Sequence, residues 1–344
     1  MIRMLGLIML ATLALAACNQ RSAREEIRVV GSSTVYPFTT LVAQEFVTKT
    51  SGARAPVVEE TGTGAGARQF CAGVGPTHPD ILNSSRRLKR SEYDNCVSNG
   101  VTDIMEVQIG ADGIVMAQAN AGARMQLTPK DIYLALAANP GGRPNTARTW
   151  RDVNPALPAT PIRVLGPPST SGTRDAFAEL ILTPGCIAAD PSAAGLRNSG
   201  DPAAFANRCT VIRSDAAYVD SGENDNLIVQ KLATDPAAIG IFGYSYLEEN
   251  KDRLRGIAVN GIEPTYETIA MQRYPGSRPL YIYVKKQHLR AIPNLQAFLN
   301  LYTTMWNPGG PLTKRGLIAA PTNTRFRSEE IVQQGIALNP AELH

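Results

Sequence analysis

The segment Ile27–Phe46, "IRVVGSSTVYPFTTLVAQEF", indicates how this chain folds. Residues typical of a buried strand, Ile27 to Val30, come directly before a turn of glycine and small hydroxyl residues, Gly31 to Thr34, and a helix-like run follows. Ser and Thr are common helix caps, and the free N–H groups of a helix N-terminus also bind anions. The segment therefore allows two interpretations, an ordinary helix cap or an anion site.

Strand-like and helix-like runs alternate along most of the chain. "APVVEE" precedes "TGTGAGARQFCAG", "DIMEVQIG" precedes "ADGIVMAQA", and "PIRVLGPP" precedes "STSGTRDAFAELIL". This alternation predicts an α/β fold with mainly parallel sheets. The chain has 344 residues, of which 44% are hydrophobic. At ~150 residues per domain, this length predicts about two domains.

The N-terminus has the pattern of an export signal. A basic start at Arg3 is followed by an apolar stretch and then by Leu15-Ala16-Ala17-Cys18. The apolar stretch is shorter than the ~20 residues of a membrane span. Leu-Ala-Ala-Cys resembles the bacterial lipobox, in which the cysteine is acylated and becomes the first mature residue. We expect a lipoprotein signal peptide over 1–17, lipid (palmitate) on Cys18 and a tether over 18–26; a plain signal peptide with a chance cysteine is the alternative.

These features predict a protein of the periplasm or cell surface that a lipid anchors to the membrane.

Four cysteines remain after Cys18, an even number in an oxidising compartment. Local closure favours two disulfides, Cys71–Cys96 and Cys186–Cys209, and four reduced thiols are the alternative. The three histidines are scattered and no Cys-x-x-Cys pair occurs, so we expect no metal site and no cofactor.

Charge and motifs argue against several other functions. The formal net charge is only +4 and no basic-aromatic interleaving occurs, so we expect no nucleic-acid partner. No serine lies in a G-x-S-x-G motif, and no His/Asp cluster fits a two-metal phosphatase. The sequence therefore predicts a binding protein and not an enzyme, and we expect it to be a monomer.

The strand–turn–helix arrangement of the opening segment recurs. Its turns are Gly31–Thr34, Thr61–Gly66 ("TGTGAG") and Ser169–Thr173 ("STSGT"), and a related turn follows a short strand at "NSSR". Ligands of α/β sheets bind outside the carboxyl ends of the strands, where such turns lie. Several turns of one type therefore predict that they converge on a single anion.

Five stretches of the sequence together carry a family resemblance. "GSSTVYPF", "TGTGAG", "NSSR", "SGTRDAF" and "AAIGIFGYSYL" occur in this order between about Ile27 and Leu317. Together they resemble the phosphate-binding proteins of high-affinity phosphate ABC importers, the PstS family. The resemblance implies a type II periplasmic-binding-protein fold, with two α/β lobes, two crossing strands as a hinge and phosphate in the cleft.

The resemblance also implies the function, a receptor that delivers inorganic phosphate to a membrane ABC permease. A phosphate-binding signalling or adhesion protein on the same fold is an alternative, and an exported phosphate-ester hydrolase with Ser33 or Ser171 as nucleophile is a weaker one. The lobes are expected at 27–110 plus 279–344 and at 111–278, with crossing strands at "QIGADGIVM" and "RPLYIYV". The phosphate contacts implied by the family are Thr34, Val35, Thr63, Ser85, Arg86, Ser171, Gly172, Thr173 and Arg174.

Two departures from the family pattern concern selectivity. Some members have an aspartate at the position of Ser85, which accepts the proton of hydrogen phosphate and so rejects sulfate. Many have an arginine shortly before Ser-Gly-Thr, where this chain has Pro167 and Pro168. The positive charge must then come from Arg174 or Arg86, although either could instead form a surface salt bridge. Other carboxylates that could approach the ligand are Asp112, Glu60 and Asp225.

Overall fold

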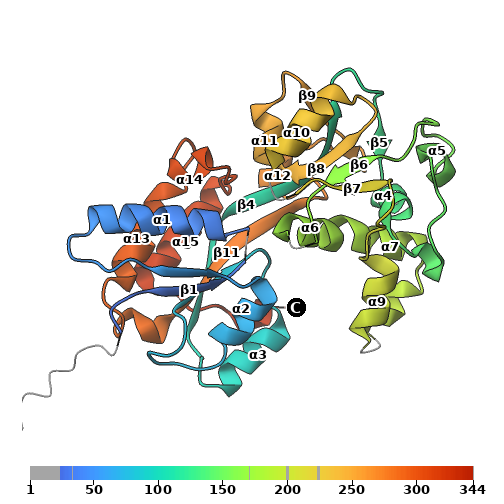
Figure 1. Ribbon diagram of the computed structural model, residues 1–344. Coiled ribbons are helices and arrows are strands. Elements are labelled where there is room, and N and C mark those ends of the chain that lie inside the picture. The colour runs from blue at the N-terminus through green and yellow to red at the C-terminus, as the bar shows by residue number, and fades with distance from the viewer. Residues whose placement is uncertain (1–23, 33, 170, 199–200, 223–224, 344) are drawn as a thin grey trace, which may run out of the picture.

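The computed structural model describes residues 24–32, 34–169, 171–198, 201–222 and 225–343 (Figure 1). The predicted signal peptide, Cys18 and most of the tether lie outside these ranges, as does Ser33. Within them, no helix combines the length and the apolar character that a membrane crossing requires.

One half of the molecule is built on three parallel strands. β1 (Arg28–Gly31) lies between β2 (Val57–Glu60) and β3 (Ile81–Ser84), and β11 (Ser277–Lys285) adds to β3 in the antiparallel sense. Valine and isoleucine in these strands suit a sheet that helices cover on both faces. The helices of this half are α1 (Tyr36–Lys49), α2 (Thr63–Phe70), α3 (Arg90–Ser98), α13 (Leu295–Met305), α14 (Pro311–Lys314) and α15 (Thr322–Gln334).

The other half continues the same sheet through β4 (Ile104–Ala119). The order β4-β8-β6-β7 joins β8 (Ile239–Gly243), β6 (Val164–Gly166) and β7 (Tyr218–Asp220), while β9 (Leu254–Gly256) also pairs with β4. β5 (Gln126–Leu127) and β10 (Ala258–Val259) form a separate pair. The helices here are α4 (Pro129–Leu136), α5 (Trp150–Val153), α6 (Gly172–Phe177), α7 (Thr183–Ala189), α8 (Ala193–Asn198), α9 (Pro202–Cys209), α10 (Asp225–Thr234), α11 (Tyr244–Glu249) and α12 (Tyr266–Ala270).

Two long strands connect the halves. β4 and β11 pair antiparallel from Ser277↔Gly113 to Lys285↔Ile104, with an irregularity between Leu280 and Tyr281. The first part of β4 thus lies beside β11, and its last part lies beside β8. Figure 1 shows both strands running from one half to the other. The predicted α/β architecture with two crossing strands is confirmed.

The buried apolar side chains form separate cores in the two halves. The largest cluster draws its buried residues from 111–274 and from Ile318, and it includes the large buried side chains of Trp150, Phe177 and Phe242. Two further clusters draw theirs from 27–109 and 280–332 and include Phe46 and Trp306. Each large apolar side chain that is fully buried contributes roughly 1.5–3 kcal/mol. We call the half around the clusters from 27–109 and 280–332 lobe one, and the other half lobe two.

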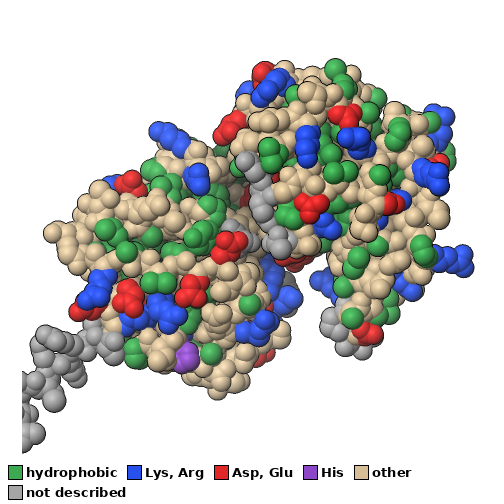
Figure 2. All heavy atoms as spheres, viewed as in Figure 1, with side chains coloured by type: hydrophobic (Ala, Val, Ile, Leu, Met, Phe, Trp, Pro, Cys, Tyr) green, Lys and Arg blue, Asp and Glu red, His purple; other side chains and the backbone are tan. Residues whose placement is uncertain are grey.

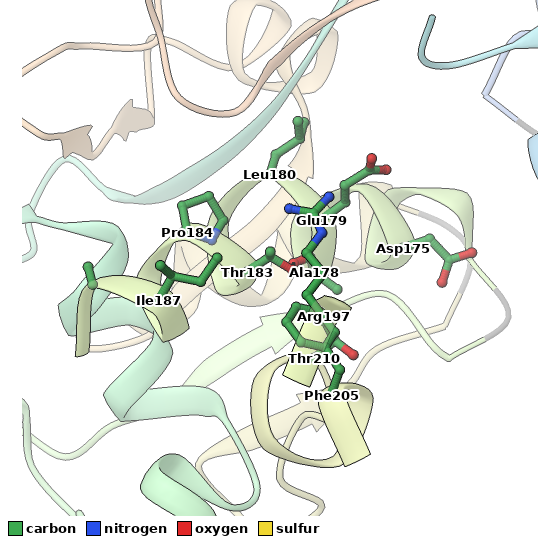
Figure 3. Close-up of a pocket in the computed structure, with 11 residues that line it drawn as sticks. Asp175, Ala178, Glu179, Leu180, Thr183, Pro184, Ile187, Arg197, Phe205 and Thr210 are labelled. Carbon is green, nitrogen blue, oxygen red and sulfur yellow. The ribbon is translucent and has the colours of Figure 1, made fainter. Parts of the chain in front are cut away.

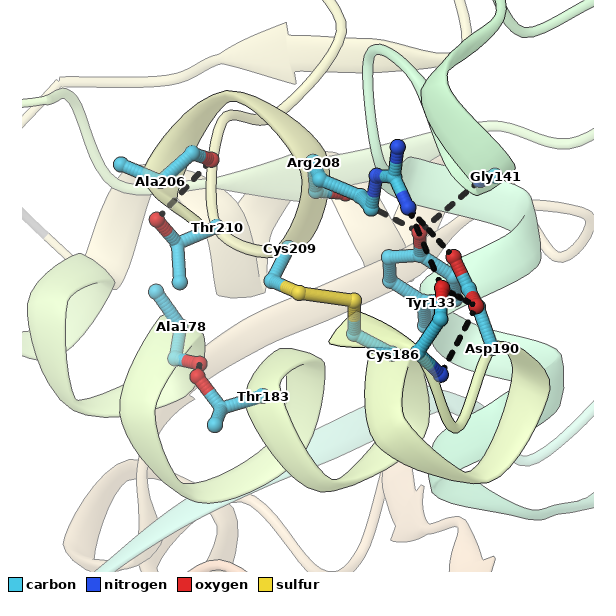
Figure 4. The surroundings of a disulfide bond; sticks show 11 residues. Tyr133, Gly141, Ala178, Thr183, Cys186, Asp190, Ala206, Arg208, Cys209 and Thr210 are labelled. Atoms are coloured by element: carbon cyan, nitrogen blue, oxygen red, sulfur yellow. Dashed lines mark hydrogen bonds and ion pairs between the residues drawn. A yellow bond between two sulfur atoms is a disulfide. The ribbon is translucent and has the colours of Figure 1, made fainter. Parts of the chain in front are cut away.

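Each lobe contains one disulfide. Cys71 at the end of α2 pairs with Cys96 of α3, with a Cα–Cα distance of 4.1 Å. Cys186 and Cys209 join α7 to α9 at 5.2 Å (Figure 4). An ion pair between Arg208 and Asp190 supports the same junction at 2.9 Å. Both bonds are the local pairs that the sequence favours, and neither links the two lobes.

The second disulfide has a testable effect on stability. Replacing Cys186 and Cys209 together by serine should lower the free energy of unfolding by about 2–4 kcal/mol, since the bond joins residues at a sequence separation of 23. Urea unfolding followed by circular dichroism measures this change. Peptide mapping without reduction is the control for connectivity, and recovery of a bridge between Cys71 or Cys96 and Cys186 or Cys209 would contradict the assignment.

Candidate functional site

A cleft between the lobes contains two adjoining cavities. The inner cavity, about 200 Å³, and the neighbouring cavity, about 360 Å³, share Thr34 and Gly172. Figure 2 shows the hollow that separates the lobes. The inner cavity is lined by Ser32, Thr34, Gly62, Thr63, Gly64, Ser85, Arg86, Gly172, Asp175, Ala176, Glu179 and Arg278. Residues lining the neighbouring cavity include Glu60, Asp112, Ser171, Thr173 and Asp225.

The turns that follow β1, β2 and β3 are locked together by their backbones. Gly31 has a φ of 132°, and a Cβ atom on it would lie 2.1 Å from the carbonyl oxygen of Asn83. A Cβ atom on Gly66 would lie 2.5 Å from the Cα of Gly31, so α2 packs directly against β1. The carbonyl of Gly31 accepts the N–H groups of Thr61 and Gly62 at 2.9 and 2.8 Å. Glycine at these positions therefore lets the three turns converge.

Two threonine hydroxyls in the inner cavity already act as acceptors. The Oγ1 of Thr34 accepts from Nη2 of Arg278 at 2.6 Å, and the Oγ1 of Thr63 accepts the N–H of Ser85 at 3.2 Å. The hydroxyl of Ser85 lies 3.2 Å from that of Thr63. A hydroxyl has one hydrogen and two lone pairs, so each threonine can still donate to a ligand.

Neither Thr34 nor Thr63 caps the helix that follows its turn, so the helix-cap interpretation is wrong for these two turns. The N-caps of α1 and α2 are Val35 and Gly62, and neither helix has a side-chain cap. Val35 is buried in the core of lobe one, which leaves only its backbone for a ligand contact. Ser171, in contrast, caps α6, because its Oγ accepts the N–H of Thr173 at 3.2 Å.

Arg278 lines the inner cavity and was not predicted from the sequence, as was also the case for Asp175 and Glu179. Arg278 is 5% exposed, and its Nε and Nη2 donate to Oδ2 of Asp112 at 3.2 and 3.1 Å. The two residues face each other in the register of β11 and β4. Because 166 positions separate the two residues, no local sequence pattern indicates that they pair. The only sequence signal was that each lies in a stretch expected to cross between the lobes.

The two arginines chosen from the sequence have other partners. Arg86 lines the inner cavity, but its Nη1 and Nη2 donate to both carboxylate oxygens of Glu92 at 2.9 and 2.7 Å. Arg174 lies outside the described lining of either cavity. Its guanidinium packs 4.5 Å from the ring centre of Tyr218, and its Nη1 donates to the carbonyl of Pro167 at 3.3 Å. Arg278 therefore replaces Arg174 as the buried cation of the cleft.

Carboxylates also line both cavities. Asp175 and Glu179 belong to the inner cavity, and Glu60, Asp112 and Asp225 to the neighbouring one. The side chain of Asp175 is open to the cleft, yet partial desolvation raises its pKa, against the opposing effects of Arg278 and Arg174. The cleft thus offers hydroxyl and guanidinium donors to an anion together with a few fixed acceptors.

The chain is similar to known proteins over most of its length. Residues 17–304 match the model of the PBP superfamily domain. The protein SphX of Synechococcus elongatus is 31% identical over 314 residues, which cover 87% of this chain and 81% of SphX. The phosphate-binding protein PstS of Staphylococcus saprophyticus is 28% identical, covering 90% of this chain and 87% of that protein.

A solved structure is also similar to this chain. A crystal structure described as a possible phosphate-binding protein from Planctomyces limnophilus superposes with a TM-score of 0.70 and 26% identity, covering 91% of this chain and all of the other. Family model, relatives and fold agree over most of the chain. The chain therefore belongs to the PstS family of phosphate-binding proteins, within the PBP superfamily.

Proposed function

We propose that this protein is an extracytoplasmic lipoprotein that binds inorganic phosphate between its lobes and delivers it to a membrane ABC permease. The observation that supports this function best is the inner cavity, where hydroxyls of lobe one and the buried guanidinium of Arg278 face the start of α6 in lobe two. The proposed contacts are Thr34, the backbone of Val35, Thr63, Ser85, Ser171, Gly172, Thr173 and Arg278, with Arg86 at the edge.

These contacts are sufficient for tight binding. Hydrogen bonds to a charged group contribute about 1.5–3 kcal/mol each, and micromolar affinity needs about 8 kcal/mol in total. Several such bonds exceed this sum even after losses from desolvation. Because the donors come from both lobes, a bound anion favours the closed cleft, and the permease can recognise that state.

We place the lobe boundaries at 27–110 plus 279–344 and at 111–278, with β4 and β11 as the hinge.

The N-terminal segment suits an anchored receptor. Arg24 is 8% exposed, and its Nη2 donates to Oδ1 of Asp80 at 2.6 Å, which fixes the chain to lobe one shortly after Cys18. Only six residue steps separate Cys18 from Arg24, a reach of at most about 20 Å. A lipid on Cys18 would therefore hold lobe one close to the membrane surface.

Calorimetry of the mature protein tests phosphate binding and the role of Arg278. Arg278→Gln should weaken phosphate binding about 100-fold, because two charge-assisted bonds worth roughly 3 kcal/mol together are lost. Arg174→Gln is the matched control and should have a much smaller effect, because Arg174 packs on Tyr218. Circular dichroism checks that both variants fold. Equal losses in the two variants, or unchanged binding in Arg278→Gln, would contradict the assignment.

Fractionation of cells tests the anchor. Cys18→Ser should move the protein from the membrane fraction to the soluble fraction, because a thioether to lipid can no longer form. Asn19→Ala keeps the cysteine and serves as the control that stays with the membrane. A Cys18→Ser protein that remains in the membrane fraction would show that lipid on this residue is not the anchor.

Uptake of labelled phosphate separates transport from signalling. Deleting the gene should slow uptake at low external phosphate, and the wild-type gene should restore it. The Arg278→Gln gene should not restore it, because that variant lacks the proposed cation of the site. Normal uptake in the deletion strain would favour the signalling or adhesion alternative.

A further inference from the structure

The turn over 85–89, between β3 and α3, separates two cavities. Ser85 and Arg86 line the inner cavity together with Asp175 and Glu179, which Figure 3 shows on one helical segment of lobe two. The next residue, Arg87, lies outside the described lining of that cavity and borders a second cavity of about 390 Å³ on lobe one. Arg87 is therefore placed to act on the turn and not to contact the ion itself.

A forked ion pair joins Arg87 to the crossing strand β4. Its Nε lies 3.0 Å from both carboxylate oxygens of Glu106, and its Nη2 donates to Oε1 of the same residue at 2.7 Å. Pairs of this kind are stronger and more directional than bonds between neutral groups. The side chain of Glu106 is only 14% exposed, so water competes little for it. The pair therefore fixes the turn relative to β4.

The neighbouring residue, Leu88, connects the same turn to β11. Its N–H donates to the hydroxyl of Tyr283 at 2.7 Å, and this hydroxyl donates to Oε2 of Glu106 at 2.8 Å. Tyr283 is fully buried, and it lies opposite Glu106 in the register of β11 and β4. A buried network whose members are all bonded holds its parts in one arrangement. Both crossing strands therefore hold the turn.

The C-terminal segment supplies the remaining partner of Arg87. Oε2 of Glu342 accepts from Nη2 of Arg87 at 2.9 Å, and the carbonyl of Glu342 accepts from Nη1 at 3.1 Å. The N–H of Leu338 donates to the carbonyl of Ile104 at 2.7 Å, which ties this segment to the start of β4. All three nitrogens of the guanidinium thus have acceptors, and these acceptors hold it on the side of the turn opposite the inner cavity.

We infer that Arg87 is a positioning residue of the phosphate site, which holds the turn against the crossing strands and so sets where the hydroxyl of Ser85 meets the ion. This inference rests on the proposed phosphate binding and adds a residue that does not touch the ligand. A hydrogen bond weakens steeply when its distance or angle departs from the optimum. Because β4 and β11 continue into lobe two, the turn stays aligned with the strands about which the lobes close.

Calorimetry with inorganic phosphate tests this inference on the mature protein. Arg87→Gln and Glu106→Gln should each weaken phosphate binding about tenfold, or about 1.4 kcal/mol, because either change opens the forked pair. The two variants change the net charge in opposite directions, so a general electrostatic effect would weaken binding in the first and strengthen it in the second. Arg90→Gln removes the same charge as Arg87→Gln, from an exposed pair with Asp94, and should bind phosphate as wild type does.

A double-mutant cycle shows whether Arg87 acts through Ser85. In the Ser85→Ala background, Arg87→Gln should change the phosphate affinity by less than about twofold, because the hydroxyl that it positions is absent. Its effect on the urea midpoint of unfolding should be the same in both backgrounds, and circular dichroism checks that each variant folds. An equal loss of phosphate affinity in the two backgrounds would show that Arg87 does not act through Ser85.

The outcomes separate this inference from the proposed function. If wild type binds phosphate and both glutamine variants bind it as tightly, Arg87 has no positioning role and the proposed function stands. Tighter binding by Glu106→Gln also contradicts the inference, since charge alone would then explain the results. If wild type does not bind phosphate, the proposed function fails and the inference fails with it.

Discussion

The ion pair between Arg278 and Asp112 is the interaction on which the cleft depends. Both residues lie on the crossing strands, and the arginine is 5% exposed. A buried cation without a partner would be strongly destabilising, and removing one partner of such a pair costs several kcal/mol. Asp112 therefore allows a guanidinium to remain at the base of the cleft. By also donating to Thr34, Arg278 links the crossing strands to the first turn of lobe one.

The turns of lobe one supply the rest of the site through backbone packing. The close approach of Gly31 to Asn83 and Gly66 leaves no room for a side chain at either glycine. Asn83, fully buried, accepts the hydroxyl of Thr39 at 2.9 Å, which ties α1 to the end of β3. Thr34, Thr63 and Ser85 are thus placed by three neighbouring strand ends, and their hydroxyls need little reorganisation to meet a ligand.

Local patterns were enough to predict much of this arrangement. Alternating runs of strand and helix predict the α/β fold, and the repeated glycine and hydroxyl turns identify Thr34, Thr63 and Ser85 as residues of one cavity. Arg278 could not be found in this way, because its role depends on a pairing with Asp112 across 166 positions. The packing of Arg174 could not be predicted either, because the sequence shows its position on the helix but not the ring of Tyr218 beside its side chain. The sequence likewise allowed a helix cap in the first turn, although neither α1 nor α2 has a side-chain cap.

A buried network of hydrogen bonds around Asp80 connects several segments of lobe one. Asp80 is fully buried and accepts from Arg24, from the N–H of Arg28 and from His288. The Nε2 of His288 accepts the N–H of Gly75, so its Nδ1 carries the hydrogen and the ring is neutral. Lys285, also buried, donates to the carbonyl of Gly73 at 2.6 Å, and burial lowers its pKa to about 7 against the effect of Asp80.

These bonds fasten the end of β11 and the N-terminal segment to the same sheet. The crossing strands are different, because the register of β11 and β4 shifts between Leu280 and Tyr281, close to the Arg278–Asp112 pair. A bulge locally disrupts the ladder and eases bending. An anion bound at Arg278 would therefore lie beside the crossing strands, with the hydroxyls of lobe one on one side and the start of α6 on the other.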